Sequence, residues 1–197
     1  AGTDGDRRPL TGHRHVHLLH LDLDGDRHLD HVLLWAPEGL DGRAQAAIRE
    51  VRATFMKGGP GRLSLAIAGL GSLDDLESLP APYGASLGRL AGPATDWTSR
   101  TPFVAPRHLK QRGRNTLEGQ VAAELEHRGI VEPVEVELCA EESLGLRHHV
   151  RVRRNGPPPP VDCGYALRLR FARPIAGPLC LGYGSHFGLG LFEAEAS

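Results

Sequence analysis

The segment from Gly177 to Phe192, GPLCLGYGSHFGLGLF, constrains the fold of this chain more than any other stretch. It combines five glycines, at positions 177, 182, 184, 188 and 190, with apolar residues and a single histidine. Glycine loses more conformational entropy on folding than any other residue, so dense glycine in an apolar segment needs a compensating reason. The usual reason is that another backbone, often a phosphate chain, comes close to the main chain. We therefore expect a tightly packed loop that another backbone approaches.

The charged residues are segregated along the chain, although the net charge is only −1. Five basic residues and no acid lie between positions 97 and 117, eight glutamates and one arginine between 115 and 143, and seven arginines and one acid between 144 and 173. A chain with such blocks can be neutral overall and still present a basic face, which favours a polyanionic partner. Arginine is also far more frequent than lysine in this sequence. This preference suits phosphate contacts, but a GC-rich genome would produce it equally well.

Two basic regions are candidates for phosphate binding. The first is a loop whose alternative interpretation is a solvated basic turn; its residues are Arg107, His108, Lys110, Arg112 and Arg114. The second is a pair of strand faces with period-two spacing, formed by Arg147, His149, Arg151 and Arg153 and then by Arg168 and Arg170. If these strands are neighbours, they predict a basic sheet surface that a nucleic acid could follow.

Cysteine usage and hydropathy indicate the compartment. Cys139, Cys163 and Cys180 lack metal-binding spacing, so we interpret them as buried thiols in a reducing environment. The sequence has no secretory signal and no apolar run of membrane length, so we expect a cytoplasmic protein that has no membrane partner. The polar start, AGTDGDRR, suggests a linker within a longer polypeptide.

Hydrophobic periodicity predicts an α+β fold. In the first half we expect strands at 13–21, 29–35 and 63–70, a helix from its cap Asp41 to about Phe55, and mostly loop over 71–95. In the second half we expect strands at 97–104, 131–138, 146–153 and 165–171 and a helix at 116–128. Two such halves suggest tandem ferredoxin-like (RRM-like) βαββαβ units, although the second lacks an obvious second helix. We divide the chain into a linker (1–11), an N-terminal subdomain (12–95), a C-terminal subdomain with the glycine-rich loop (96–192) and a tail (193–197).

Histidines crowd the first predicted strand. His13, His15 and His17 alternate, so they project from one face, and imidazoles near neutral pKa suit general acid–base work. Alternate histidines can also ligate zinc, or each can be an ordinary histidine bonded to the backbone. His31 opens the second strand and faces the first if the two form a hairpin.

The turn between these strands resembles the start of a calcium-binding loop, with aspartates at 22, 24, 26 and 30. Position six of the loop would be glycine and is Arg27, and position twelve would be an acid and is Leu33. The departures favour a simple acidic turn.

Three blocks together resemble one protein family. They are TGHRHVHLLHLDLDGDRHLDHVLLWAP, DWTSRTPFVAPRHLK and PLCLGYGSHFGLGLF, and they span residues 11 to 192. They are similar to the CRISPR RNA-processing endoribonuclease of the repeat-associated (RAMP) superfamily, as found in the C-terminal half of the fused subunit of type I-G (I-U) systems. The resemblance implies two ferredoxin-like folds, an RNA partner, other subunits of a type I effector complex, and cleavage of precursor RNA within its repeat without a metal or other cofactor.

The family's chemistry is attack of a ribose 2′-OH on the adjacent phosphate, which needs a base, an acid and a cation. The resemblance implies a base from the first strand, with His15 preferred over His17 and His13, and His31 as the acid or its partner. Lys110 would stabilise the phosphorane, with Arg107 and His108 beside it. RNA contacts would come from the basic residues above, Arg112, Arg114, Arg147 and Arg151 included, and from Gly182, Tyr183, Gly184, His186 and Gly188 of the glycine-rich segment.

Other interpretations stay open at this point. One is a non-catalytic module that only holds guide RNA, against which the histidine excess argues. Another is a zinc-dependent hydrolase built on HRHVH, which lacks an acidic ligand at motif spacing. A purely structural protein fits the basic blocks poorly.

Overall fold

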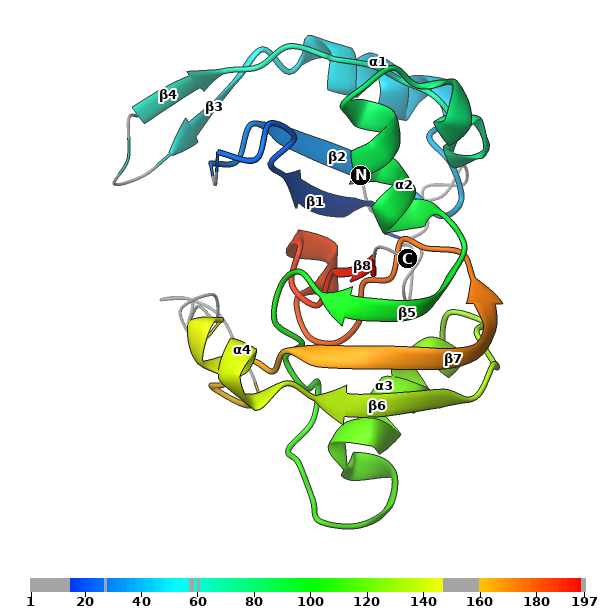
Figure 1. The fold of residues 1–197 in the computed structure, drawn as a ribbon. Helices are drawn as coiled ribbons and strands as arrows, with labels where there is room; N and C mark the ends of the chain where they lie inside the picture. The colour runs from blue at the N-terminus through cyan, green and yellow to red at the C-terminus, as the bar shows by residue number, and fades with distance from the viewer. Residues whose placement is uncertain (1–14, 27, 57–58, 60, 147–159, 196–197) are drawn as a thin grey trace.

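The computed structural model describes residues 15–195 except 27, 57–58, 60 and 147–159. Its elements are β1 (His17–Leu21), β2 (His31–Trp35), α1 (Gly42–Glu50), β3 (Ala53–Met56), β4 (Gly61–Ser64), the 3-10 helix η1 (Leu73–Ser78), α2 (Tyr83–Ala91), β5 (Ala94–Ser99), η2 (Gly113–Asn115), α3 (Leu117–Glu126), β6 (Val134–Leu138), α4 (Ala140–Gly145), β7 (Leu167–Ile175), η4 (Ser185–Phe187) and β8 (Phe192–Ala194). The protein is thus mixed α+β, as predicted (Figure 1). Within the described ranges, no helix has the length and apolar character needed to span a membrane.

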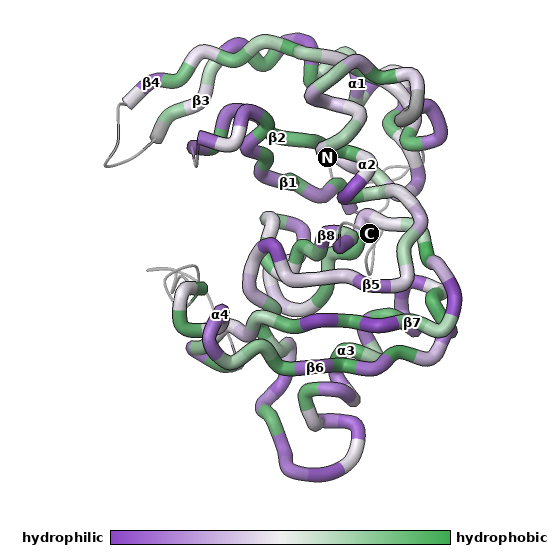
Figure 2. The backbone as a smooth tube through the Cα atoms, viewed as in Figure 1, coloured by the Kyte–Doolittle hydropathy of each residue, from purple (hydrophilic) through white to green (hydrophobic). Residues whose placement is uncertain are grey.

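A four-stranded antiparallel sheet organises the second half, in the order β6-β7-β5-β8. Strand β7 alternates buried Leu167, Leu169 and Phe171 with outward-facing arginines, because successive side chains of a strand point to opposite faces. Hydrophilic and hydrophobic residues interleave along β6 and β7 in Figure 2. Val121 and Leu125 of α3 join the apolar face of the sheet in one core.

The other face of this sheet carries ion pairs, so Arg168 and Arg170 do not form the basic surface predicted for them. Arg168 Nε lies 2.6 Å from Glu195 Oε1, and Arg170 Nε lies 3.0 Å from Asp96 Oδ1. The register sets Glu135 opposite Arg170 and Glu137 opposite Arg168. Opposite charges that face each other across a ladder attract, and here they neutralise the arginines. The predicted strand at 146–153, with Arg147, His149, Arg151 and Arg153, lies outside the described residues apart from its first position.

The first half forms two separate hairpins, β1-β2 and β3-β4, so tandem ferredoxin-like units are not confirmed. The predicted hairpin between the first two strands is confirmed, with His17 opposite Trp35 and Leu21 opposite His31. Asp41 caps α1 as predicted, since its side chain accepts from Ala44 N.

Several predictions in this half were wrong, and the strand expected at 63–70 is the shorter β4, which ends at Ser64. Helix α1 ends at Glu50, and Phe55 belongs to β3, because the β-branched and aromatic residues after Glu50 favour an extended chain that pairs with β4. The region 71–95 is not mainly loop, since it contains η1 and α2. Leu87 and Leu90 of α2 pack into a core, and their spacing was visible in the sequence.

This second core joins the two halves of the chain. Leu19, Leu21 and Leu90 of the first half pack with Cys180 and Leu191 of the second. The cysteines are free thiols, but of the three only Cys180 is buried, and burial raises its pKa to about 12.

The predicted tail is also shorter than expected, because β8 extends through Ala194 and pairs with β5.

The backbone that approaches the glycine-rich segment is the protein's own. A Cβ on Gly182 would lie 2.6 Å from Val104 O, and a Cβ on Gly190 would collide with Leu181 O. Both glycines also have positive φ, of 88° and 59°, which other residues adopt only with strain. The glycine density is therefore explained by close packing within the fold.

Replacing Gly190 by alanine should lower the free energy of unfolding by about 3 kcal/mol, through backbone strain and overpacking. Gly145→Ala is the matched control, because Gly145 lies in α4 and a Cβ added there would have nothing within 4 Å. Urea unfolding followed by circular dichroism measures both. Equal stability of the two variants would contradict the packing explanation.

Candidate active site

Three histidines meet where the glycine-rich segment crosses the start of β1. The rings of His17 and His186 lie 4.2 Å apart between centroids, and His15 lies edge-on to His186 at 5.4 Å. Trp35, opposite His17 in the β1-β2 hairpin, packs against the His17 ring at 4.9 Å. We call His15, His17 and His186 the histidine cluster.

The local fold explains this meeting. His17 shares the inward face of β1 with Leu19 and Leu21, so it is only 1% exposed. The short helix η4 is bounded by Gly184 and Gly188, both in the left-handed conformation, which turns the chain at each end and sets η4 against β1.

A hydrogen bond fixes the tautomer of His17. Its Nδ1 lies 3.2 Å from the carbonyl oxygen of Ser185. Because a carbonyl only accepts, Nδ1 carries the hydrogen, and in the neutral ring Nε2 carries the lone pair. This hydrogen bond therefore links β1 to η4 and fixes the orientation of the His17 ring against the ring of His186.

The members of the cluster differ in environment. Burial lowers the pKa of His186, and a positive charge on neighbouring His15 lowers it further. Desolvation disfavours the charged imidazole, so His186 is held neutral and able to accept a proton. His15 is partly exposed to solvent.

A buried ion pair between Glu124 and Arg128 holds the start of η4 in position. Glu124 Oε2 accepts from Gly182 N at 2.9 Å and from Arg128 Nη1 at 3.0 Å, and Arg128 Nη2 donates to Ser185 Oγ at 3.5 Å. Both charged side chains are 11% exposed. Sequence reasoning missed this pair, although Glu124 and Arg128 stand at the i, i+4 spacing of the predicted helix. Trp35 was also missed and could have been found from the hairpin register.

His31 is not part of the cluster. It pairs with Leu21, four residues along β1 from His17, which corresponds to about 13 Å of strand. Its Nδ1 lies 3.0 Å from Asp30 Oδ1, and its ring contacts Tyr83. The structure therefore does not bring together the expected base and acid.

Lys110 also lies away from the histidines. The loop between β5 and α3 extends past β6 in Figure 1, at the opposite end of the molecule from β1 and β2. Buried Gln120 of α3 holds this loop, since its side chain accepts from Arg107 N at 3.0 Å and donates to Arg107 O at 2.9 Å. Arg107, His108, Lys110, Arg112 and Arg114 are all exposed there.

Most main-chain amides of the glycine-rich segment are bonded within the fold. Gly182 N donates to Glu124, Tyr183 N to Val104 O, Gly188 N to Ser185 O and Gly190 N to Pro102 O. These amides are not available to a phosphate, contrary to our expectation for Gly182 and Gly188. The partly exposed side chains of Tyr183 and His186 remain candidates for contact with a base. His13, Arg147 and Arg151 lie outside the described residues.

Acidic ligands gather elsewhere. Asp22, Asp24 and Asp30 offer oxygens that all lie within 4.8 Å of one another, and within the described ranges the histidine cluster is not part of any comparable group. Asp22 accepts from Gly25 N and Asp30 from Leu23 N, so these carboxylates also stabilise the turn.

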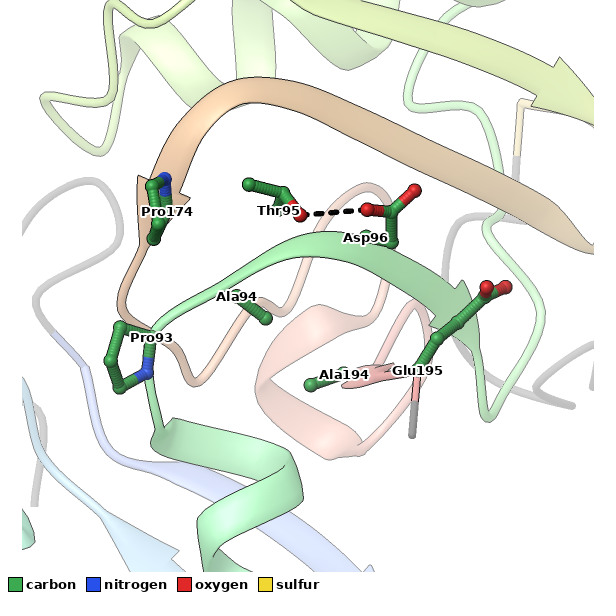
Figure 3. Close-up of a pocket in the computed structure, with 7 residues that line it drawn as sticks. All are labelled: Pro93, Ala94, Thr95, Asp96, Pro174, Ala194 and Glu195. Atoms are coloured by element: carbon green, nitrogen blue, oxygen red, sulfur yellow. Dashed lines mark hydrogen bonds between the residues drawn. The ribbon is translucent and has the colours of Figure 1, made fainter. Parts of the chain in front are cut away.

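The hollow in Figure 3 lacks a catalytic set. It has a volume of about 430 Å³ between β5, β8 and the end of β7, and its polar lining includes Thr95, Asp96 and Glu195. Both carboxylates are engaged by arginines of β7. The histidine cluster is therefore the better candidate site.

Comparison of the chain with protein-family models, curated proteins and solved structures found no match.

Two partly buried histidines, His186 of the cluster and His20 of β1, predict that the free energy of unfolding falls as the pH is lowered from about 7 to 5. Burial lowers the pKa values of His186 and His20 below the ordinary 6.5, so the unfolded chain takes up protons more readily. Their contribution is complete above pH 6.5 and is lost as the pH falls through the folded-state values.

The free energy of unfolding in urea at pH 7.5 and pH 5.0 tests this. His186→Gln should flatten the dependence, whereas His28→Gln, at a solvent-exposed position, should leave it unchanged. A wild-type chain equally stable at both pH values would disprove the assignment.

Proposed function

We propose that this chain is a metal-independent endoribonuclease that cleaves precursor CRISPR RNA within its repeat and retains the product in a type I effector complex. The observation that carries the proposal is the histidine cluster, in which a histidine of the glycine-rich block meets two histidines of the first block. Two of the three blocks that carry the family resemblance thus converge on one acid–base site.

The roles follow from exposure. His17 is too buried to reach a phosphate, so it is a positioning residue that holds His186 through stacking and the Ser185 carbonyl. His186, whose lowered pKa keeps it neutral at neutral pH, is the base, and the partly exposed His15 beside it is the acid. This assignment replaces the expectation that His15 is the base.

Proton transfer at both ends balances the reaction. His186 takes the proton of the ribose 2′-OH as the 2′-oxygen bonds to the adjacent phosphorus. The bond between phosphorus and the 5′-oxygen breaks, and His15 supplies the proton to that oxygen. The products are a 2′,3′-cyclic phosphate and a 5′-OH, and proton exchange with water restores both imidazoles.

The order of elements supports a ferredoxin-like second half. Strands β5 and β6 run parallel and flank β7, which is the split β-α-β arrangement, and β8 completes the sheet beside β5. The glycine-rich segment, with η4, occupies the place of the second helix.

A guide-RNA-binding module without catalysis is the second candidate. It is favoured by the bonding of His17 to a main-chain carbonyl and its burial, which are typical of a structural histidine. The two functions differ in whether RNA is recovered intact.

His186→Gln and His15→Gln should each slow single-turnover cleavage about 10²–10⁴-fold, because each removes one proton-transfer group. The assay uses the cognate repeat RNA in EDTA, beside a copy with a 2′-deoxy nucleotide at the cleavage site. His28→Gln is the control and should cleave at the wild-type rate.

The outcomes separate the candidates. Cleavage of the first RNA alone, ending in a cyclic phosphate, agrees with the endoribonuclease. Tight binding of both RNAs without cleavage would establish the binding module instead.

A further inference from the structure

Two groups of the described arginines differ in their partners. Those of β7, together with Arg100 and Arg128, are each held by a carboxylate. Arg43 and Arg49 of α1, Arg52 and Arg62 form no ion pair with any carboxylate of the described residues. Residues 42–73 contain one acid, Glu50, and five basic residues. This part of the surface therefore has positive charge that the carboxylates of the described residues do not neutralise.

An exposed aromatic ring stands among these arginines. Phe55 of β3 is 72% exposed, although a large apolar side chain gains stability from burial. It lies opposite Arg62 of β4, so the two side chains share one face of the β3-β4 ribbon. Next to it is Gly61, where an added Cβ would lie 3.8 Å from the Phe55 ring, so no partner side chain covers the ring from that position.

The other face of the ribbon leads into a hollow of mixed character. Leu65 N donates to Arg52 O at 2.8 Å, which continues the pairing beyond β4. Arg49, Arg52, Leu65 and Ile67 line a hollow of about 450 Å³ at this end. Guanidinium groups beside apolar walls suit a nucleotide, whose phosphate is anionic and whose base is flat and apolar on its faces.

We infer that the β3-β4 ribbon and the end of α1 bind single-stranded RNA, with a base stacked on Phe55 and phosphates held by Arg62 on the same face of the ribbon and by Arg52 and Arg49 at the hollow on its other face. Aromatic rings flanked by unneutralised arginines are typical of single-strand binding. A protein partner would explain the exposed Leu65 and Ile67 but not the excess of positive charge. The inference rests on the proposed function in taking RNA as the polyanion, but it does not depend on cleavage.

The surface lies apart from the histidine cluster. The ribbon projects beyond β1 and β2 in Figure 1, and β1 carries the cluster against η4. It would thus hold a segment of the RNA outside the cleavage point. Its loss should weaken binding without changing the rate of the chemical step at saturation.

The test measures binding of a fluorescein-labelled 15-nucleotide oligouridylate by fluorescence anisotropy. The full chain carries His186→Gln throughout, so cleavage cannot alter the probe. Phe55→Ala should raise Kd about tenfold, and Phe55→Tyr should restore it, because stacking on an aromatic ring contributes roughly that much per base.

The salt dependence separates stacking from charge. Arg62→Gln should reduce the slope of log K against log salt by about 0.7, the value of one phosphate contact on a single strand, whereas Phe55→Ala should leave the slope unchanged. Arg173→Gln is the matched control, since Arg173 is 80% exposed but paired with Glu132. Val131→Ala controls for loss of an exposed apolar side chain, as Val131 is 85% exposed.

Location is read directly from cross-linking. Ultraviolet irradiation of the complex should attach uridine to the tryptic peptide that spans 53–57, which contains Phe55. Wild-type affinity of both Phe55→Ala and Arg62→Gln would overturn the inference. So would unchanged RNA binding by Phe55→Ala together with a self-association of the chain that this substitution abolishes, which would make the surface a contact between copies.

Discussion

The arrangement of the histidines depends on the hydrogen bonds that the carboxylate of Glu124 accepts. It accepts hydrogen bonds from Gly182 N and from Arg128, and Arg128 in turn reaches Ser185 at the start of η4. A buried ion pair loses hydration, so it persists only where other hydrogen bonds satisfy its atoms, as here. Through these bonds, Glu124 of α3 and Arg128 hold the glycine-rich segment in position at Gly182 and Ser185. His186 then meets β1 at a set distance, and His17 bonds to the carbonyl of Ser185.

The same segment is where the two halves of the chain become one structure. Its residues Cys180 and Leu191 pack with Leu19 and Leu21 of β1, while Phe192 at its end packs in the core of the sheet. Its glycines allow this because side chains at Gly182 and Gly190 would strike neighbouring backbone. Dense glycine thus serves internal packing first. Any RNA contact by the segment must come from side chains on its outer side.

Much of the fold was predictable from period and capping. The alternation in β7 and the cap at Asp41 are local signals: β7 overlaps the strand expected at 165–171, and α1 begins after the expected cap. The limits of α1 were not, because the sequence after Glu50 forms a strand only when β4 is present to pair with it. The neutralisation of Arg168 and Arg170 was equally hidden, since it depends on the register that sets β5 and β6 beside β7.

The site shows the same division between local and long-range information. The alternation of histidines predicted that His15 and His17 share a face, but not that His186, almost 170 positions away, would complete the group. His31 was included because it opens the second strand of a possible hairpin, yet the register of that hairpin places it at the far end of β1 from His17.

The arrangement of charge follows from these positions. Carboxylates neutralise the arginines of the sheet face, so an RNA would not be drawn along it. Exposed basic residues lie, among other places, at two ends of the molecule, on the loop that Gln120 anchors and on the ribbon with Phe55. In the function that we propose, an RNA bound at both of these regions would be held close to the histidine cluster, which lies between them.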